Sequence, residues 1–598
     1  MATRAKIDSN NTELAFAEES SIATLPSVPT WFPAEPNSYG DTGGEITTVA
    51  REPISSDRQQ RKGAVTDLDA TVDYESDLTQ SNLSDLMQGF MFANYRKKAE
   101  FGISNKISNG TSLGTLITAV DSGTKTFTIV TGSGSLVFVA GDKIRTKGFT
   151  NAGNNGTFTV ASVTATTVVV TEATVTEASP PAAAQMASAV CSVTSGTSTF
   201  AITKGGANFR AGDLIKTTGF TNTANNGLFY VASSTASTVV ISGATLTTEA
   251  TPPDAAKLVV VGFQFASGDL TITNSGTAYP YLTATAKDLT QLGIIPGEWI
   301  FVGDGSNTAY KYATAADNGF ARVRSVTATV ITLDKTYATK VTDSGASKTI
   351  RLFVGRVLKN ETGSSIVRRT YNFERKLGAP DDAALTLIQS EYVVGATPAE
   401  LELTLPKANK VTAKLKYIGT DHQTRDAATG VKTGTRETLV AEDAFNTSSD
   451  ISHLKLSVLS TTNANPDPLF QYLSDISVSI NNNLTPNKAL ATLGAFDITA
   501  GNFDVSAKMT AYFANVSAAA SIRANDTLSL DMQLVKNNSG IGIDLPSMTA
   551  SKNLNNVKKN EPVEVPLENN ASSAVEVDST LNHTMLVVFF DYLPDLAA

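Results

Sequence analysis

Apolar and polar residues alternate over long stretches of the chain, most regularly between Leu473 and Tyr512. Ile476, Val478 and Ile480 alternate with serines, and the alternation resumes after the polar turn Asn481–Asn483. The returning segment contains Val505, Ala507, Met509 and Ala511, again separated by polar residues. A period of two over this length predicts half-buried antiparallel strands. We therefore expect a self-assembling building block whose polar sheet faces and edges form the functional surface.

Further strands of the same kind are predicted throughout 359–598, which we expect to be the main core. Leu401, Leu403 and Leu405 alternate with polar residues, as do the apolar positions of 411–417 and 528–534. Met585–Phe590 is continuously apolar, which is typical of a strand that is buried on both faces. Residues 37–111 form the first part of the same core. The chain is therefore predicted to be mainly β.

One amphipathic helix interrupts this pattern near 79–95. Leu83, Leu86, Met87 and Phe90 recur at a spacing that forms a single apolar stripe. Thr79 or Asn82 is the expected N-cap, and Gly89 either ends the helix or lies inside it. A single helix beside sheets is expected to cover a sandwich or a barrel.

Residues 112–183 and 184–256 are two copies of one small β-domain, offset by 71 positions from Gly156 to Gly227. The matching segments are 123–129 with 196–202, 141–144 with 212–215, 148–151 with 219–222 and 154–158 with 225–229. A diverged third copy is expected over 257–358. Each Asn-Gly pair predicts a hairpin turn with positive φ at both residues. The inserted domains are predicted to be small β-sandwiches, either Ig-like or barrel-like.

Two polar segments are candidates for contacts with another subunit. Residues 1–36 are expected to form an extended arm in which Trp31 and Phe32 act as anchors, although a disordered terminus is the alternative. Residues 419–446 lack apolar periodicity and are predicted to be a long loop. Loops of this length in compact domains are usually functional. The candidate contacts there are Asp421, His422, Arg425 and Arg436.

Composition and charge reduce the range of possible functions. Only 17% of the 598 residues are charged, below the roughly 25% typical of soluble proteins, as expected where much of the surface meets other subunits. The net charge of −10 argues against holding nucleic acid by bulk attraction. Cys191 is the single cysteine, so neither an internal disulfide nor a cysteine-based zinc site is expected. No apolar run suits a transmembrane helix or a secretory signal, which predicts synthesis in a cytoplasm without membrane insertion.

Residues that could carry chemistry are scattered. His422, His453 and His583 have no partner at metal-ligand spacing. Gly110–Gly114 matches a nucleophile elbow around Ser112, but the β-branched run that follows does not suit the required helix. Asp381 and Asp382 are more simply explained as turn residues than as glycosidase acids. We therefore expect no enzymatic activity, cofactor or metal.

Several segments resemble the tail tube (major tail) proteins of long, non-contractile-tailed bacteriophages. The resemblance covers 31–95 and about 290–598. It rests on 31–40 (WFPAEPNSYG), 46–54, 58–63, 66–68, 77–92, 371–374, 477–484 and 496–505. The duplicated segment 112–256 is less specific to this family.

The resemblance implies a tail-tube β-sandwich or barrel core with one flanking helix. It implies six copies per ring and rings stacked into a hollow tube of the virion tail, through which double-stranded DNA passes without specific binding. The implied partners are further copies of the chain, a tape measure protein, and tail terminator and tip proteins. The arm 1–36 and the loop 419–446 are then ring-to-ring contacts, and the repeats decorate the outside, where they could touch a host surface. The alternative is a receptor-binding or adhesin protein whose repeats are its functional part.

A tube for DNA places a condition on the charge of its inner wall. A cationic wall would hold DNA, because each neutralised phosphate releases counterions. Screening acts over about 8 Å at physiological salt, so only charges near the wall matter. We therefore predict a net acidic or neutral wall, and subunits joined through sheet edges.

Overall fold

The computed structural model describes residues 12–26, 29–52, 54, 56, 59–109, 116–130, 138–274, 276, 279–378, 389–426, 430–513, 516–551 and 557–594. The protein is mainly β, as predicted. The described residues form several sheets and no closed barrel, which favours the sandwich alternative. The chain divides into unit 1 (1–95 with 357–589) and unit 2 (96–356 with 590–598), which are described separately.

Unit 1 is organised by the 17-residue strand β28 (Gln389–Leu405), which takes part in two sheets. Its first half lies between β27 (Tyr371–Leu377) and β30 (Asp421–Arg425). We call this sheet the small sheet. It continues from β27 through β1 (Thr12–Glu18) and β2 (Thr30–Pro33) to β31 (Thr435–Arg436). The arm predicted from the sequence is therefore partly a component of this sheet.

The second half of β28 belongs to the large sheet, between β29 (Thr412–Gly419) and β33 (Leu473–Asn481). On one side follow β5 (Gly63–Asp77), β4 (Gly43–Ala50) and β3 (Ser38–Tyr39). On the other side follow β36 (Asp504–Tyr512), β39 (Glu564–Ala571), β38 (Ser539–Ala550), β37 (Leu528–Lys536) and β32 (Ile451–Val458). The strands β33 and β36 are those predicted from alternation, and their alternating apolar residues are buried apart from the half-buried Leu473.

The remaining strands of unit 1 are β40 (Leu586–Phe590), the hairpin of β34 (Thr485–Lys488) and β35 (Ala495–Thr499), and β26 (Arg356–Lys359). The continuously apolar segment forms β40, in which every residue is buried, as predicted. β40 pairs with β38. β34 and β35 form a separate hairpin, and β26 lies at the boundary of the unit. The core includes Tyr74, Phe90, Phe373, Leu415 and Val478, from both sheets and the first helix.

The predicted helix is α1 (Ser84–Phe90), and it buries Leu86, Met87 and Phe90. The expected caps are not used: Leu83 takes the N-cap position, while Thr79 and Asn82 bond each other's backbone amides. Gly89 lies inside the helix. The position requires glycine, because an added Cβ would come 2.6 Å from the Tyr371 hydroxyl. A second helix, α2 (Val516–Ala524), was not predicted; its alanine-rich sequence has no apolar stripe.

Gly395 allows β28 to pass from one sheet to the other. Its φ is +64°, and an added Cβ would lie 2.3 Å from Thr420 Oγ1. The register between β27 and β28 shifts next to this residue. A left-handed backbone and a close neighbour therefore require glycine at this bend.

Gly395→Ala is expected to destabilise unit 1 more than backbone strain alone would. Gly363→Ala is the control, since Gly363 also has positive φ but faces open space. A left-handed backbone costs about 1–2 kcal/mol for an ordinary residue, and only Gly395→Ala adds a clash with Thr420. In urea unfolding, Gly395→Ala should lower the free energy of unfolding by at least about twice as much as Gly363→Ala. Equal losses would show that the close approach is unimportant.

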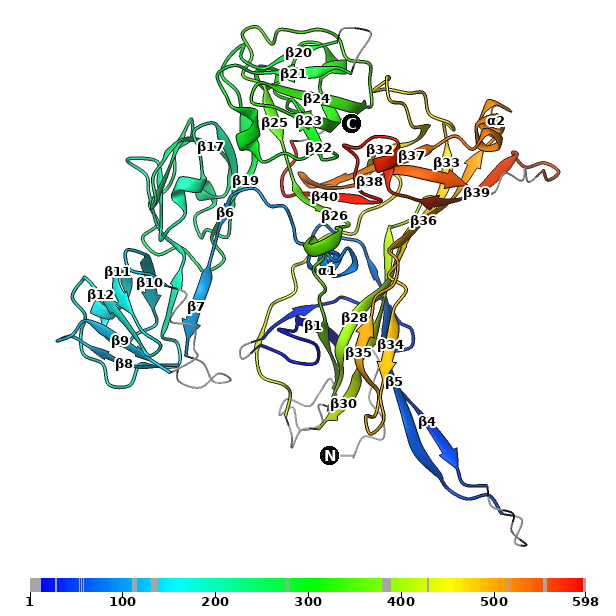
Figure 1. Cartoon of the computed structure of the whole chain (residues 1–598). Coiled ribbons are helices and arrows are strands. Elements are labelled where there is room, and N and C mark those ends of the chain that lie inside the picture. Colours follow the sequence, from blue (N-terminus) through cyan, green and yellow to red (C-terminus); the bar gives the residue numbers. More distant parts are fainter. Residues whose placement is uncertain are drawn as a thin grey trace. The chain divides into compact units, whose positions relative to one another are not determined.

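Unit 2 consists of three β-blocks with one shared strand order, each with its own hydrophobic core (Figure 1). Block 1 runs β7 (Ser104–Ser108), β13 (Gln185–Ser188), β10 (Lys143–Lys147), β11 (Gly156–Val163), β12 (Thr167–Val170), β9 (Thr126–Ile129), β8 (Ile117–Asp121). Block 2 runs β6 (Glu100–Phe101), β19 (Lys257–Gln264), β16 (Asp213–Thr218), β17 (Gly227–Ser234), β18 (Thr238–Ser242), β15 (Thr199–Ile202), β14 (Val190–Thr194). Block 3 runs β19, β25 (Arg351–Phe353), β22 (Trp299–Val302), β23 (Gly319–Val326), β24 (Val330–Thr336), β21 (Tyr281–Thr283), β20 (Thr271–Thr273).

The Asn-Gly pairs do not form the predicted hairpin turns. Asn155 and Asn226 both have φ of −102°, and only the following glycines have positive φ. Asn154 is fully buried, and its amide bonds Val175 O and Glu177. The side chain of Asn155 bonds both backbone groups of Phe149. These asparagines therefore hold a loop in place before the strand begins.

Candidate functional site

One face of the large sheet is polar across six strands. Strand pairing places the polar residues of β5, β29, β28, β33, β36 and β39 on a common face, opposite the core. We call this the polar face. Its charged residues are Asp73, Glu75, Asp77, Glu400, Glu402, Asp475, Asp504, Glu564, Glu568, Lys414, Lys416 and Lys508. Nine carboxylates and three lysines make these positions clearly acidic.

The cations of the polar face lie next to carboxylates. Lys414 Nζ is 3.5 Å from Asp73, and Lys416 Nζ is 3.6 Å from Glu400. These are half-exposed ion pairs and contribute little to stability. Since each lysine faces an acidic neighbour, the face offers few unpaired cations to a polyanion.

The hairpin of β4 and the first part of β5 extends beyond the sheet (Figure 1). Ile46, Val49 and Val65 are between 52% and 59% exposed on it. Side chains alternate along a strand, so Ile46 and Val49 lie on opposite faces. Apolar side chains on both faces of a two-stranded hairpin are poorly protected unless another surface covers them.

A second exposed hairpin lies beside the first. Lys488 of β34 forms ion pairs with Asp67 and Asp69 of β5, the latter at 2.7 Å. Leu490, Leu493 and Phe496 are exposed on this hairpin. We call the exposed apolar residues of both hairpins the hairpin patch: Ile46, Val49, Val65, Leu490, Leu493 and Phe496. Exposed apolar residues on two hairpins that ion pairs hold side by side favour an interaction surface.

The interface role predicted for Trp31 needs correction, because the structure buries it in its own subunit. Its side chain is 1% exposed, and its indole N–H donates to Thr433 O at 3.1 Å. Phe32 is half-buried, and its ring centroid lies 5.7 Å from that of Phe16. These aromatic residues anchor the N-terminal segment to unit 1.

The segment 419–446 is not the structureless loop predicted from its lack of periodicity. β30 and β31 lie in it and pair with β28 and β2. Both are short, polar edge strands, so their side chains carry no apolar alternation. We call the part that crosses the small sheet, residues 430–436, the strap.

The predicted charged residues of this segment separate into two groups. Arg436 donates two hydrogen bonds to the buried Glu374, at 2.9 and 2.6 Å, and lies over Trp31. Arg425 lies 6.0 Å from the ring centroid of Tyr392. In contrast, Asp421 bonds the His422 backbone and Gln423, and His422 packs close to Gly44. Only Arg425 and Arg436 thus join Trp31 around Tyr392.

The sequence did not single out the polar residues beneath the strap. Asn372 and Glu374 lie on one face of β27 and are almost fully buried. The Tyr392 hydroxyl donates to Glu374 at 2.5 Å. Burial, together with this bond, raises the pKa of Tyr392 to about 12. Alternation of polar with aromatic residues in 371–374 was the available signal, but it does not show which segment covers them.

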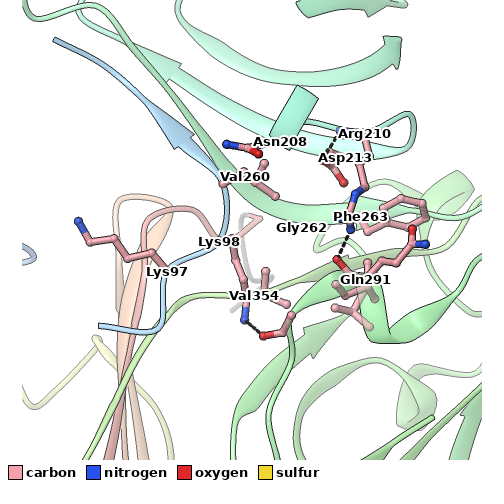
Figure 2. Close-up of a pocket in the computed structure, with 14 residues that line it drawn as sticks. Lys97, Lys98, Asn208, Arg210, Asp213, Val260, Gly262, Phe263, Gln291 and Val354 are labelled. Atoms are coloured by element: carbon pink, nitrogen blue, oxygen red, sulfur yellow. Dashed lines mark hydrogen bonds between the residues drawn. The ribbon is translucent and has the colours of Figure 1, made fainter. Parts of the chain in front are cut away.

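Unit 2 contains a pocket of about 210 Å³ between blocks 2 and 3, shown in Figure 2. Arg210 donates to Gln291 O at 2.7 Å, and Lys98 bonds Gly293 O and Glu298. The Arg210 amide donates to Asp213, whose pKa is raised to about 6 by burial. Because these polar groups already bond each other, we interpret the pocket as a joint between the blocks.

Residues with catalytic or metal-binding potential form no evident centre. Within the described ranges, no three His, Cys, Asp or Glu residues could together hold a metal ion. His583 lies 3.4 Å from Asp544, with both side chains fully buried. Ser112, Asp381 and Asp382 lie outside the described residues. No helix in the described part of the chain has the length and apolar character needed to cross a membrane.

Comparison with known proteins gave one family. The family model described as phage tail tube protein matches residues 266–571, just over half of the chain. The match includes block 3 and most of the large sheet. A search of curated proteins found no match.

Proposed function

Since this chain belongs to the phage tail tube protein family, we propose that six copies form a ring and that rings stack into the tube of a long, non-contractile tail. The coarser conclusion follows from the family itself: the chain is a structural tail protein of the virion, and it assembles into a tube. The number of subunits, the type of tail and the delivery of DNA through the lumen belong to the proposal.

The hairpin patch is the observation that carries the proposal. It exposes six apolar side chains that a lone subunit leaves in water. A neighbouring copy would bury them, at about 25 cal/mol per Å² of apolar surface. Negative-stain imaging of the purified protein tests the assembly: hollow rods with sixfold end views are expected. Isolated particles at high concentration, even with a tail-tip complex as nucleus, would contradict it.

We assign the polar face to the lumen wall of the proposed tube. Its acidic balance agrees with the expectation that a wall for passing DNA must not attract phosphates. Its width across six strands suits a continuous lining. Neither the arm nor the segment 419–446 is needed for this assignment, although both remain candidates for ring-to-ring contacts.

Reversing two charges of the polar face is expected to make tubes retain DNA. Glu402 is exposed and Glu568 is half-buried, and both lie on the side of the sheet opposite the core, so tubes of Glu402→Lys with Glu568→Lys should still form. Each phosphate neutralised by a new lysine releases counterions and strengthens binding at low salt. Binding of labelled duplex to purified tubes should rise and then disappear at high salt. Glu437→Lys with Glu561→Lys is the control of equal charge, since both residues are exposed and neither belongs to the strands of the polar face. Retention of DNA by both variants would refute the lumen assignment.

The remaining partners follow from the proposed tube. We propose that a tape measure protein occupies the lumen during assembly and that terminator and tip proteins bind the tube ends. Blocks 1 and 2 would decorate the outside. The alternative, a receptor-binding protein, is not favoured by the pocket of unit 2, whose polar groups are already paired.

Deletion of 112–256 separates these two functions. If the blocks are decorations, tubes are expected to form without them, and particles should contain hundreds of copies of the shortened chain. If the blocks bind a receptor, particles should contain few copies of the intact chain, and the deletion should abolish adsorption. Quantitative mass spectrometry of particles together with an adsorption assay checks both.

A further inference from the structure

Lys432 of the strap lies against a buried amide on the small sheet. Its Nζ is 3.4 Å from Asn372 Oδ1, although the two residues are 60 positions apart in sequence. Asn372 is 1% exposed. On its other side, Asn372 Nδ2 donates to Glu19 Oε1 at 3.3 Å. The Asn372 carboxamide therefore lies between the Lys432 amine and the Glu19 carboxyl group and contacts both.

The surroundings of Lys432 increase the fraction of its neutral amine, although the ammonium form still predominates at neutral pH. Nζ lies 4.5 Å from the centroid of the Tyr392 ring, which packs edge-on against Trp31. Burial, assisted by the nearby positive charge of Arg425, lowers the pKa of Lys432 to about 8. A lysine with a lowered pKa has a larger fraction of neutral, nucleophilic amine near neutral pH.

Glu19 is held firmly beside the amide nitrogen of Asn372. Its carboxyl accepts bonds from Gly395 N at 2.9 Å, Ala23 N at 2.8 Å and Thr370 Oγ1 at 2.7 Å. Burial raises the pKa of Glu19 above its usual range, although these hydrogen bonds oppose the shift. The group is thus positioned to carry a proton to or from its neighbour.

We propose that Lys432 and Asn372 form an intramolecular isopeptide bond, with Glu19 as the catalytic proton carrier. Lys432 Nζ attacks Asn372 Cγ to form the new C–N bond. The bond from Cγ to Nδ2 breaks, and ammonia leaves. One proton passes from Nζ to the departing Nδ2: once the new C–N bond has formed, the Glu19 carboxylate, which accepts a hydrogen bond from Nδ2, takes a proton from Nζ and gives it to Nδ2. No oxidant or other reactant is required.

The bond would fasten the strap covalently to the middle of the small sheet. A segment held only by two short edge strands and side-chain contacts would then stay in place when the subunit is pulled. Unlike a disulfide, such a link is insensitive to reducing agents. This inference concerns the folded subunit and does not depend on the proposed tube.

Intact mass spectrometry of the full-length protein under denaturing conditions tests the proposal. We expect a mass lower by one ammonia than the sequence requires, and a digest in which the peptide containing Asn372 is joined to that containing Lys432. Lys432→Arg should restore the full mass, and Lys414→Arg should not. Glu19→Gln, with both reacting residues kept, should slow the appearance of the joined peptide at least about 100-fold.

Two outcomes would overturn the proposal. One is a full-mass protein without joined peptides after prolonged incubation, with circular dichroism showing a native fold. The other is a mass deficit of one ammonia that persists in Lys432→Arg, which would indicate a succinimide or another cross-link elsewhere in the chain. If Glu19→Gln fails to fold, the comparison of wild type with Lys432→Arg still decides whether the bond forms.

Discussion

Replacing Ile46 and Val49 together by aspartate is expected to leave a folded subunit that no longer forms tubes. Both side chains are more than half exposed, so the substitutions remove little packing within the subunit. In the proposed assembly they become buried against a neighbouring copy. Each buried side chain of this size contributes about 1.5–3 kcal/mol, and a buried unpaired carboxylate adds a further penalty.

The expected size of this effect follows from the relation that each 1.4 kcal/mol of binding free energy changes the dissociation constant about tenfold. Loss of both side chains should weaken each contact between copies by at least about 100-fold. Sedimentation velocity should show a single slow species at concentrations where the wild type forms rods. Electron microscopy should show no rods.

A matched control separates the hairpin patch from general effects of charge. Val557 is 72% exposed and lies elsewhere in unit 1, so Val557→Asp should still form tubes. Circular dichroism should show unchanged melting for both variants. Normal tubes from the double variant would mean that the patch faces solvent in the assembly.

Much of the sheet structure could be predicted because the local alternation of apolar and polar residues indicates which side chains of a strand are buried. Ile476, Val478 and Ile480 are all buried in β33, and the intervening serines are not. The stripe of α1 was visible for the same reason. α2 carries no such signal, since alanine and serine suit several environments equally.

The site was harder to predict because its parts come together only through tertiary pairing. Trp31 was predicted to anchor an arm on a neighbouring subunit, but a sequence does not show whether the partner is another copy or Thr433 of the same chain. Glu19 and Gly395, which share a hydrogen bond, lie 376 positions apart. The strap could not be predicted from the sequence, because short polar edge strands show no alternation of apolar residues.

The exposed hairpin illustrates a further limit. Ile46 and Val65 fit any half-buried strand. Alternation indicates that the two faces of a strand differ, but it does not reveal that a pair of strands leaves its sheet. Only the structure shows that these apolar residues lack a cover within unit 1.

Removing the guanidinium of Arg436 is expected to be strongly destabilising. Glu374 is fully buried, and Arg436 gives it two hydrogen bonds while its own side chain stays 27% exposed. Arg436→Met leaves the buried Glu374 carboxylate with the Tyr392 hydroxyl as its one remaining hydrogen-bond donor among the described residues. Breaking a buried pair from one side costs about 3–5 kcal/mol.

Trp31 offers a local reporter for this loss, because Arg436 lies over its ring. The chain has two tryptophans, so a Trp299→Phe background makes Trp31 the only one. Urea unfolding followed by its fluorescence should show the midpoint falling for Arg436→Met. Lys416→Met, which removes a half-exposed cation, should change the unfolding free energy by less than about 1 kcal/mol.

The double variant Arg436→Met with Glu374→Gln distinguishes an unpaired charge from lost packing. If the cost of Arg436→Met comes from stranding the Glu374 carboxylate, removing that charge should recover most of the lost stability, so that the two substitutions are far from additive. If the cost comes from the side-chain stem that covers Trp31, the double variant should be as unstable as the sum of the single ones. We expect the first result, because Arg436 donates two hydrogen bonds to the buried Glu374 carboxylate, and the one at 2.6 Å is shorter than its bond to Lys432 O at 2.9 Å.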